Sequence, residues 1–322
     1  MNAEGRKRAA SIPESAPVSP WPHRIAVALA CATFPLLFIG GLVTGKGAGL
    51  AVPDWPTTFG YNMFLYPWSK MVGGVFYEHS HRLVASFVGL LTIVLASTFW
   101  LREQRQWLRW LGLAALALVI VQGVLGGLRV VLLEHTLAIV HAATAQIFFA
   151  LTICLALFTS SEWRSAPVRR PLDDGGRLRR LCAVTTALIY LQIVFGAVLR
   201  HTGERLDAHL VFAFLVAIHV VLVVARVTQH TAGIASLKRP ALALLALLVL
   251  QFVLGGMSYV AKFTALWRMS FDFIVLVTTT HLAVGALMLA ASVVLTLRTH
   301  RLSGRPLDNR ARKETFAEQF SV

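Results

Sequence analysis

Eight apolar runs, separated by short polar segments, account for most of this 322-residue chain. A helix needs about 20 apolar residues to cross a bilayer, and each run is close to that length. We therefore expect an all-α integral membrane protein. Its eight transmembrane helices are expected at residues 25–43, 82–101, 108–128, 137–159, 178–199, 208–227, 240–260 and 272–297.

Basic residues lie on alternate sides of these runs. They cluster before the first run, after the last, and in the connections that follow the second, fourth and sixth, whereas the other connections hold few. The positive-inside rule then places both termini in the cytoplasm. We expect residues 1–24 to form a disordered cytoplasmic tail rather than a signal peptide, 161–180 a cytoplasmic linker, and 299–322 a second cytoplasmic tail.

Composition supports the same class. The chain is 57% hydrophobic and only 14% charged, which is not the composition of a soluble domain. The net charge of +15 is carried by the connections expected in the cytoplasm, so we expect a lipid bilayer as partner and no nucleic acid. Cys31, Cys154 and Cys182 lie in or beside apolar runs, so we expect no disulfide. A bacterial plasma membrane is the expected location.

The chain resembles a tandem duplication. Short matching segments occur in the same order in both halves: 81–85 (HRLVA) with 209–213 (HLVFA), 122–127 (QGVLGG) with 251–256 (QFVLGG), and 141–145 (HAATA) with 281–285 (HLAVG). We expect two four-helix bundles, at 25–160 and 181–298. Because each half holds an even number of helices, a pseudo-twofold axis along the membrane normal should relate them.

A histidine occupies a corresponding place in each even-numbered run: His81, His141, His209 and His281. Ionisable side chains inside a membrane are costly and mark functional sites. Paired imidazoles ligate metals and haem iron, so the duplication predicts two sites, His81 with His141 and His209 with His281. The alternative is that each histidine only forms hydrogen bonds between helices.

The two halves differ beside these histidines. Glu78 precedes His81 by three residues, whereas Leu206 holds the same place before His209. This asymmetry suggests chemistry in the first half and electron transfer in the second. Alternatively, Glu78 only marks a helix start and pairs with Arg82.

Two further features lie near the outer ends of the runs. Arg82, Arg129 and Arg200 are candidates for binding haem propionates, because guanidinium groups pair with carboxylates; interface anchoring is the alternative. The loop at 44–77 is rich in proline and aromatic residues. It is expected to be an ordered lid over a hydrophobic site, or else an aromatic belt at the membrane surface.

Residues 48–56 (AGLAVPDWP), 78–85 (EHSHRLVA), 141–142 (HA) and 280–282 (THL) resemble the haem A synthase family, and the resemblance extends over 40–295. Members of that family oxidise the C8 methyl group of haem O to the formyl group of haem A, with water as the oxygen source. The resemblance implies a haem-dependent oxidoreductase that acts in cytochrome oxidase assembly. Haem O synthase and oxidase assembly factors are its expected partners.

The resemblance also implies roles for individual residues. His81 and His141 would bracket the substrate haem O, with Glu78 and His81 catalytic, and His209 and His281 would hold a haem b. One departure concerns the cysteine pair that many bacterial relatives carry in outward loops. Residues 44–77 and 200–207 contain no cysteine, which puts a thiol-based step in doubt.

Two other functions use the same histidines. A dihaem b-type cytochrome that takes electrons from quinol needs all four but has no use for Glu78. A proton-coupled transporter could relay protons through intramembrane histidines, although it would place them nearer the middle of the membrane.

Overall fold

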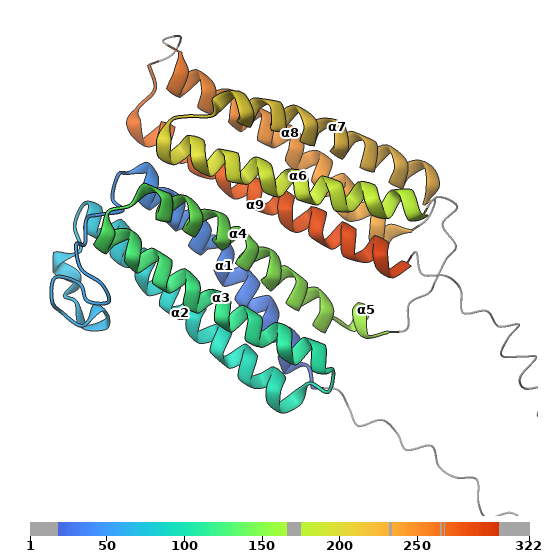
Figure 1. The fold of residues 1–322 in the computed structure, drawn as a ribbon, viewed down its shortest axis with the longest axis horizontal. Coiled ribbons are helices and arrows are strands. Elements are labelled where there is room, and N and C mark those ends of the chain that lie inside the picture. The colour runs from blue at the N-terminus through green and yellow to red at the C-terminus, as the bar shows by residue number, and fades with distance from the viewer. Residues whose placement is uncertain (1–18, 166–174, 232–233, 265, 267, 303–322) are drawn as a thin grey trace, which may run out of the picture.

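The computed structural model describes residues 19–165, 175–231, 234–264, 266 and 268–302. Most of the expected N-terminal tail, part of the linker and nearly all of the C-terminal tail lie outside these residues. Helices account for most of the described chain (Figure 1): α1 (Trp21–Gly45), α2 (Gly74–Arg102), α3 (Gln106–Leu132), α4 (His135–Thr159), α5 (Ser161–Arg164), α6 (Gly175–Thr202), α7 (Leu206–His230), α8 (Ala235–Phe263) and α9 (Phe271–Leu302).

All of these helices except α5 are long and apolar enough to cross a membrane, which confirms the eight expected spans. Each extends beyond its expected run at one or both ends. The largest difference is at α2, which begins at Gly74 instead of residue 82. Its first two turns carry polar side chains that hydropathy alone excludes, and contacts with the preceding loop satisfy these side chains. α1 begins at Trp21, so the last residues of the segment expected as a tail are helical.

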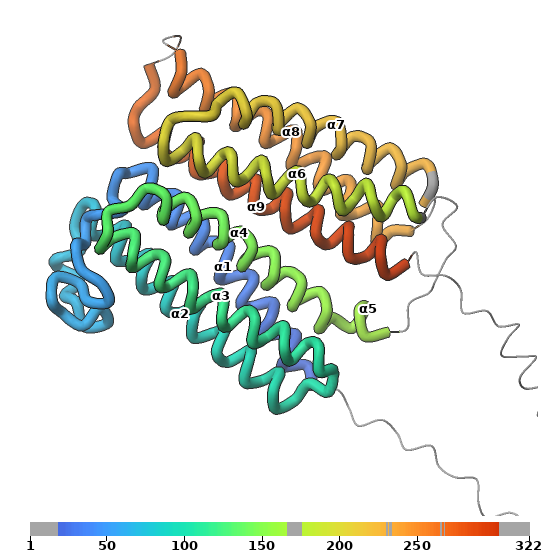
Figure 2. Tube along the Cα trace, in the orientation of Figure 1, coloured from blue at the N-terminus to red at the C-terminus, as the bar shows by residue number. Residues whose placement is uncertain are grey.

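The helices form two groups of four, α1–α4 and α6–α9, which lie side by side (Figures 1 and 2). Within each group every helix packs on its neighbours in sequence, and the first packs on the fourth. α2 and α4 are therefore diagonal partners in the first group, as α7 and α9 are in the second. The groups meet where α1 and α4 contact α9 and where α4 contacts α6. The pseudo-twofold axis between the groups stays a prediction.

Each group has its own hydrophobic core. Buried residues of the first include Leu29, Phe99 and Leu155, whereas the larger second core is built from α6–α9. A third cluster lies between the groups, where Phe149 of α4 packs against Ala286 of α9. Leucine, valine and phenylalanine dominate the cores of the two groups.

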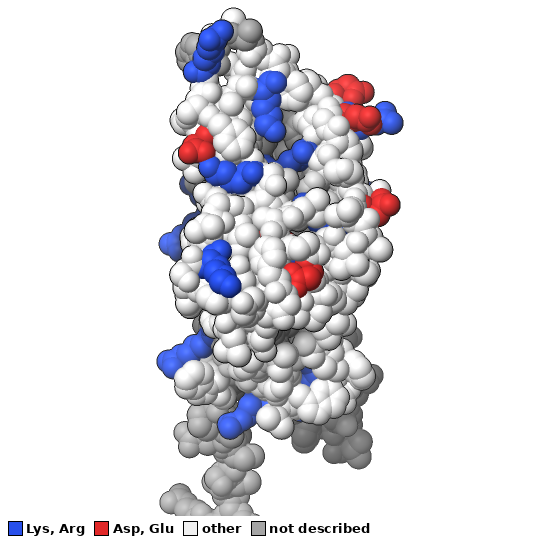
Figure 3. Space-filling view, turned by 90° about the vertical axis from the view of Figure 1, so that its left-hand side faces the viewer, with Lys and Arg blue, Asp and Glu red and all other residues white. Residues whose placement is uncertain are grey.

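The two ends of the molecule differ. We call the end that carries residues 46–73 the loop end, and the opposite end, where α1 begins and α9 ends, the basic end (Figure 1). Residues 46–73 include two short 3₁₀ turns, η1 (Met63–Leu65) and η2 (Trp68–Lys70), and no strand occurs in the part of the chain that is described. Figure 3 views the loop end, where charged side chains are scattered among uncharged ones. That the basic end faces the cytoplasm is a prediction.

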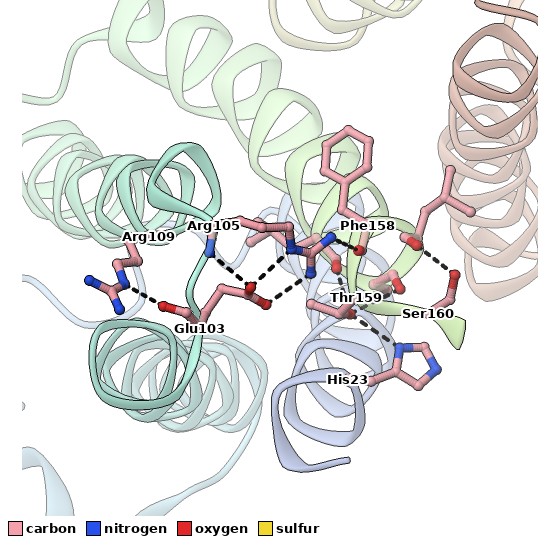
Figure 4. A network of polar contacts seen from close by, with 10 residues as sticks. His23, Glu103, Arg105, Arg109, Phe158, Thr159 and Ser160 are labelled. Carbon is pink, nitrogen blue, oxygen red and sulfur yellow. Dashed lines mark hydrogen bonds and ion pairs between the residues drawn. The ribbon is translucent and has the colours of Figure 1, made fainter. Parts of the chain in front are cut away.

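A polar network joins helices at the basic end (Figure 4). Arg105 donates from Nε and Nη2 to the Glu103 carboxylate at 2.9 and 2.8 Å, and from Nη1 to the Phe158 carbonyl at 2.9 Å. These hydrogen bonds from Arg105 lower the pKa of Glu103. His23 of α1 contacts the Thr159 hydroxyl at 3.1 Å. The connection between α2 and α3 is thereby fixed to the end of α4, and so is the start of α1.

Candidate functional site

Each of the four histidines packs against a glycine of the helix that precedes it. A Cβ atom added to any of these glycines would lie 3.1–3.3 Å from the imidazole Cε1 atom, closer than most real contacts. The four pairs are Gly40 with His81, Gly126 with His141, Gly196 with His209, and Gly255 with His281. The glycines therefore leave the space that the rings occupy. The arrangement occurs once in each of the helix pairs α1–α2, α3–α4, α6–α7 and α8–α9.

His209 and His281 meet inside the second group, because their helices are diagonal partners. Their ring centroids lie 6.3 Å apart with an interplanar angle of 69°. Metal–nitrogen bonds of about 2 Å would place two imidazoles on one ion with their centroids about 6 Å apart, so the observed spacing fits. The Nδ1 atoms of both rings are buried and have no hydrogen-bond partner. An orphaned buried nitrogen is costly, which is typical of a site that binds a further group.

Glutamines accompany three of the four rings. Gln192 Nε2 lies 3.4 Å from His209 Nε2, Gln251 Nε2 lies 3.5 Å from His281 Nε2, and the Gln122 amide lies 3.0 Å from His141 Nδ1. Each glutamine precedes the ring-packing glycine by four residues, one helical turn. Before Gly40 the corresponding residue is Leu36, so His81 has no such glutamine.

The first group places His81 and His141 on its diagonal helices, α2 and α4. His81 lies within electrostatic range of His141, Arg129 and Arg82. Its Nδ1 atom is buried without a hydrogen-bond partner, as in the second group. The structure thus brings the expected first pair into one region, with an arginine from α3 beside it.

Glu78 joins α2 to the loop that precedes it. Its side chain is buried, and Oε2 accepts from the Val52 amide at 3.0 Å while Oε1 accepts from Arg82 Nη2 at 2.8 Å. Arg82 also donates to the carbonyl groups of Val52, Asp54 and Thr57 at 2.7–3.0 Å. The Glu78–Arg82 pair weighed as an alternative is therefore present, and it anchors the loop. Arg82 is thus held by the loop, and the propionate binding expected for it stays a prediction.

Other contacts order the same loop. His79 Nδ1 lies 3.1 Å from the Thr58 hydroxyl, and both side chains are buried. The Trp55 indole lies directly against Gly127 of α3, where a Cβ atom would collide with it. The loop consequently covers the ends of α2 and α3.

Asp54 holds the turn inside this loop. Its carboxylate accepts from the backbone amides of Phe59 and Gly60 at 2.7 and 2.8 Å, and from the Thr57 hydroxyl. Partial burial by itself would raise the pKa of Asp54, but these hydrogen bonds outweigh it and lower the pKa. These contacts order the loop, and its role as a lid or as an aromatic belt stays a prediction.

Two arginines lie near the histidine pairs at the loop end. Arg129 packs against Gly49 of the loop and lies within electrostatic range of Glu78. Arg200 donates from Nη2 to the Gly41 carbonyl at 2.7 Å and from Nη1 to the Thr278 carbonyl at 3.3 Å, while its Nε atom is buried without a partner. Arg200 therefore joins α6 to α1 and α9.

Sequence reasoning missed Lys262, which shares a cavity with Arg200. The cavity measures about 110 Å³ and opens between α1, α6, α8 and α9. Its other lining residues are Thr44, Gly45, Phe271, Ile274, Val275 and Thr278. No acidic residue lines it, so two cations face one space. The sequence did carry a signal, because Lys262 follows the seventh apolar run at the end where few basic residues are expected.

The donor set suits haem more than a free metal ion. Among the described residues, no group of three or more His, Cys, Asp and Glu side chains is placed to hold a metal. The structure offers pairs of imidazoles, which is the axial donor set of a porphyrin iron. The orphaned Nδ1 atoms and the glycine-lined rings fit the same group.

Comparison with known proteins points in the same direction. A family model described as cytochrome oxidase assembly protein (COX15-CtaA) matches residues 68–208. This segment contains Glu78, His81 and His141 and ends just before His209. Proteins named heme A synthase from Shouchella clausii and Alkalihalophilus pseudofirmus are 29% and 28% identical over 187 and 175 residues, which cover 57% and 53% of this chain.

These matches are partial. They span 60% and 57% of the two relatives, and a third heme A synthase, from Halalkalibacterium halodurans, matches at 27% identity over 53% of this chain and 56% of its own length. The bacterial relatives and the eight long apolar helices support a multi-pass protein of a bacterial membrane. Over part of its length, the chain is thus similar to the cytochrome oxidase assembly family model and to proteins named heme A synthase.

Proposed function

We propose that this chain is a membrane oxidoreductase of the haem A synthase type, which oxidises the C8 methyl group of haem O to the formyl group of haem A. The observation that carries the proposal is the set of four glycine-packed histidines with a buried carboxylate beside only one of them, His81. The names of the relatives support the same activity.

His209 and His281 would hold a haem b in the second group. When bound, this haem supplies one-electron transfer, which removes electrons from the substrate site. Arg200 and Lys262 line a cavity with no acidic residue, so their charges would pair with haem propionates there. The 6.3 Å spacing of the two rings supports this assignment.

His81 and His141 would bracket the substrate haem O in the first group. The loop at 46–73 would cover it, because Trp55 of the loop packs on Gly127 of α3 and Arg129 of α3 packs on Gly49 of the loop. Arg129 would then pair with a substrate propionate at the loop end, and Arg82 would act by fixing the loop.

The reaction converts a methyl group and one water molecule into a formyl group, with the loss of four electrons and four protons. Glu78 would act on the water that attacks the oxidised carbon, by accepting its proton and by stabilising positive charge on the substrate. Hydrogen bonds from Val52 and Arg82 orient its carboxylate for this role. Leu206 could do neither, which fits a second haem that only carries electrons.

Co-expression with a haem O synthase tests the proposal directly. Chromatography of haems extracted from purified protein should reveal haem A and its hydroxylated precursor. A protein that carries haem b but leaves haem O unchanged would be an electron-transfer cytochrome, and the proposal would be wrong. A protein without haem would favour a transporter.

A further inference from the structure

A second cavity lies between α6 and α7, and its described lining residues include none of His81, His141, His209 and His281. It measures about 340 Å³ and is larger than the cavity beside Arg200. Its lining residues are Arg177, Arg180, Leu181 and Val184 of α6 and His219, Leu222 and Arg226 of α7. The α7 residues are three, four and seven positions apart, and both Arg180 and Leu181 of α6 are three or four positions from Arg177 and Val184, which places the side chains of each helix on one face.

The cavity has a charged end and an apolar end. Arg177 and Arg180 lie at the start of α6, and Arg226 lies near the end of the antiparallel helix α7, so the three guanidinium groups gather at the basic end. Val184 and Leu222 lie deeper along the helices. Seven residues of helix span about 10 Å, so the cavity runs from the membrane surface well into the apolar layer.

The apolar part is open to its surroundings. Val184 is 47% exposed and Leu222 is 49% exposed, although both lie in membrane spans. His219 lies deepest, and its Nδ1 atom donates to the Leu215 carbonyl of its own helix at 2.8 Å. None of the described residues that line the cavity is acidic. A ligand here would meet cations at one end and aliphatic side chains at the other.

We propose that this cavity binds an anionic phospholipid, with its phosphate among the three arginines and the upper acyl chain along Val184 and Leu222. Guanidinium groups pair with phosphate through two parallel hydrogen bonds, and basic pockets between membrane helices take anionic headgroups. A water-soluble phosphate ester offers the same charge but leaves the aliphatic wall uncovered. The lipid is therefore the ligand that uses the whole cavity.

This site is independent of the proposed oxidation. His209 lies in the first turn of α7 and Arg226 in the last turns, so the length of the helix separates them. A lipid bound here would hold together the α6–α7 hairpin, which carries His209. Its binding is measurable whether or not the protein oxidises haem.

The test is lipid retention by the purified full-length protein. The protein is reconstituted with phosphatidylglycerol or phosphatidylcholine, returned to detergent, and examined by native mass spectrometry. We expect wild-type protein to retain phosphatidylglycerol and to lose phosphatidylcholine. The double variant Arg180→Gln/Arg226→Gln should lose retention by about tenfold or more, because it removes two of the three guanidinium groups that bind the phosphate. Unchanged retention in this variant would overturn the proposal.

A matched control separates a specific site from general surface charge. Arg24→Gln/Arg102→Gln removes the same charge from the basic end of the first helix group, and should retain the lipid as wild type does. Equal loss in this control would contradict the proposal. Leu222→Trp fills the groove with every charge kept, and should also lower retention.

Glycerol 3-phosphate distinguishes the two phosphate sources. Displacement of the lipid by this soluble ester at comparable concentration would show that the aliphatic wall contributes nothing, and the lipid assignment would be wrong.

Discussion

The imidazole ring centroids of His209 and His281 lie 6.3 Å apart, between the diagonal helices α7 and α9. Gly196 and Gly255 make this approach possible, since side chains at those positions would displace the rings. The geometry therefore depends on four residues from four helices. This dependence leads to specific expectations for haem binding.

Loss of either histidine should empty the site. We expect His209→Ala and His281→Ala to lower bound haem b, measured by the pyridine haemochrome spectrum, without loss of membrane insertion. His219→Ala is the matched control on α7, because His219 bonds to its own helix and faces the other cavity. Wild-type haem content in both ligand variants would contradict the assignment.

Two adjacent glycines of α8 offer a sharper comparison. Gly255→Ala places a methyl group 3.1 Å from His281 Cε1, whereas Gly256→Ala points into open space. Each change makes the helical conformation more favourable by about 1 kcal/mol, because alanine has a higher helix propensity than glycine. A difference between the two variants therefore reports on the contact with His281. We expect only Gly255→Ala to lower haem occupancy or shift the haem absorption bands. Identical spectra for the two variants would show that the ring has room to move.

Glu78 is expected to be needed for oxidation. The variant Glu78→Gln should keep the fold and the haem b spectrum but accumulate haem O, with haem A formation slower by about 10²–10⁴-fold, the usual contribution of a general base. Haem chromatography after co-expression with a haem O synthase measures the effect. Normal haem A production would limit Glu78 to its structural contacts.

Arg82→Gln is the control that separates these two roles. It removes the guanidinium that bonds to three loop carbonyls and keeps the Glu78 carboxylate. If Glu78 only anchors the loop, both variants should expose the loop to protease and lose activity together. A catalytic Glu78 should instead lose activity with the loop still protected.

The loop itself should matter more for turnover than for haem b retention. Replacing residues 54–56 with glycine and serine removes the Asp54 turn and the contact of Trp55 with Gly127. We expect haem A formation to fall while the haem b content stays near wild type. Trp68→Ser, at a 79% exposed position in the same loop, should leave both unchanged. Equal activity in the two variants would favour the aromatic-belt interpretation.

Asp54 should make the loop sensitive to acid. Its folded pKa is lowered, so its carboxylate stabilises the loop above the ordinary aspartate pKa of about 3.9, and this stability is lost as the pH falls through the lower folded value. Hydrogen exchange at the Phe59 and Gly60 amides should stay slow at pH 5–8 and rise below about pH 4. Asp54→Asn should already exchange faster at neutral pH. Unaltered exchange in that variant would contradict the role of the carboxylate.

Hydropathy and charge predicted the eight helices because membrane insertion depends on local composition. They could not predict the early start of α2, because residues 78–82 are polar and contact a loop 20 or more residues earlier in the chain. The same contacts give Arg82 a role in holding the loop, which the sequence did not predict. Its charge was visible in the sequence, but the carbonyl groups that it binds carry no sequence signal.

The histidines and the Gln–Gly repeats were also visible, but their relationship was not. Matching Gln–Gly segments in α3 and α8 indicated duplication, whereas only the packed helices reveal that each glycine leaves room for an imidazole. Gly40 escaped notice because Leu36 replaces the accompanying glutamine. The smallest unit that recurs is a pair of successive helices, in which a glycine of the first helix packs against a histidine of the second.

The position of α9 has a consequence for biogenesis. It is synthesised after the other seven described spans, yet 61% of its most apolar stretch is buried, against 22–39% for the other spans, and it packs on α1, α4, α6 and α8. The surfaces of α1 and α4 that it covers must face lipid or an insertase until α9 has been inserted. The two halves therefore complete their contact only after α9 is in place. A nonsense codon just before α9 would leave the seven earlier described spans inserted but undocked, as substrates for membrane quality control.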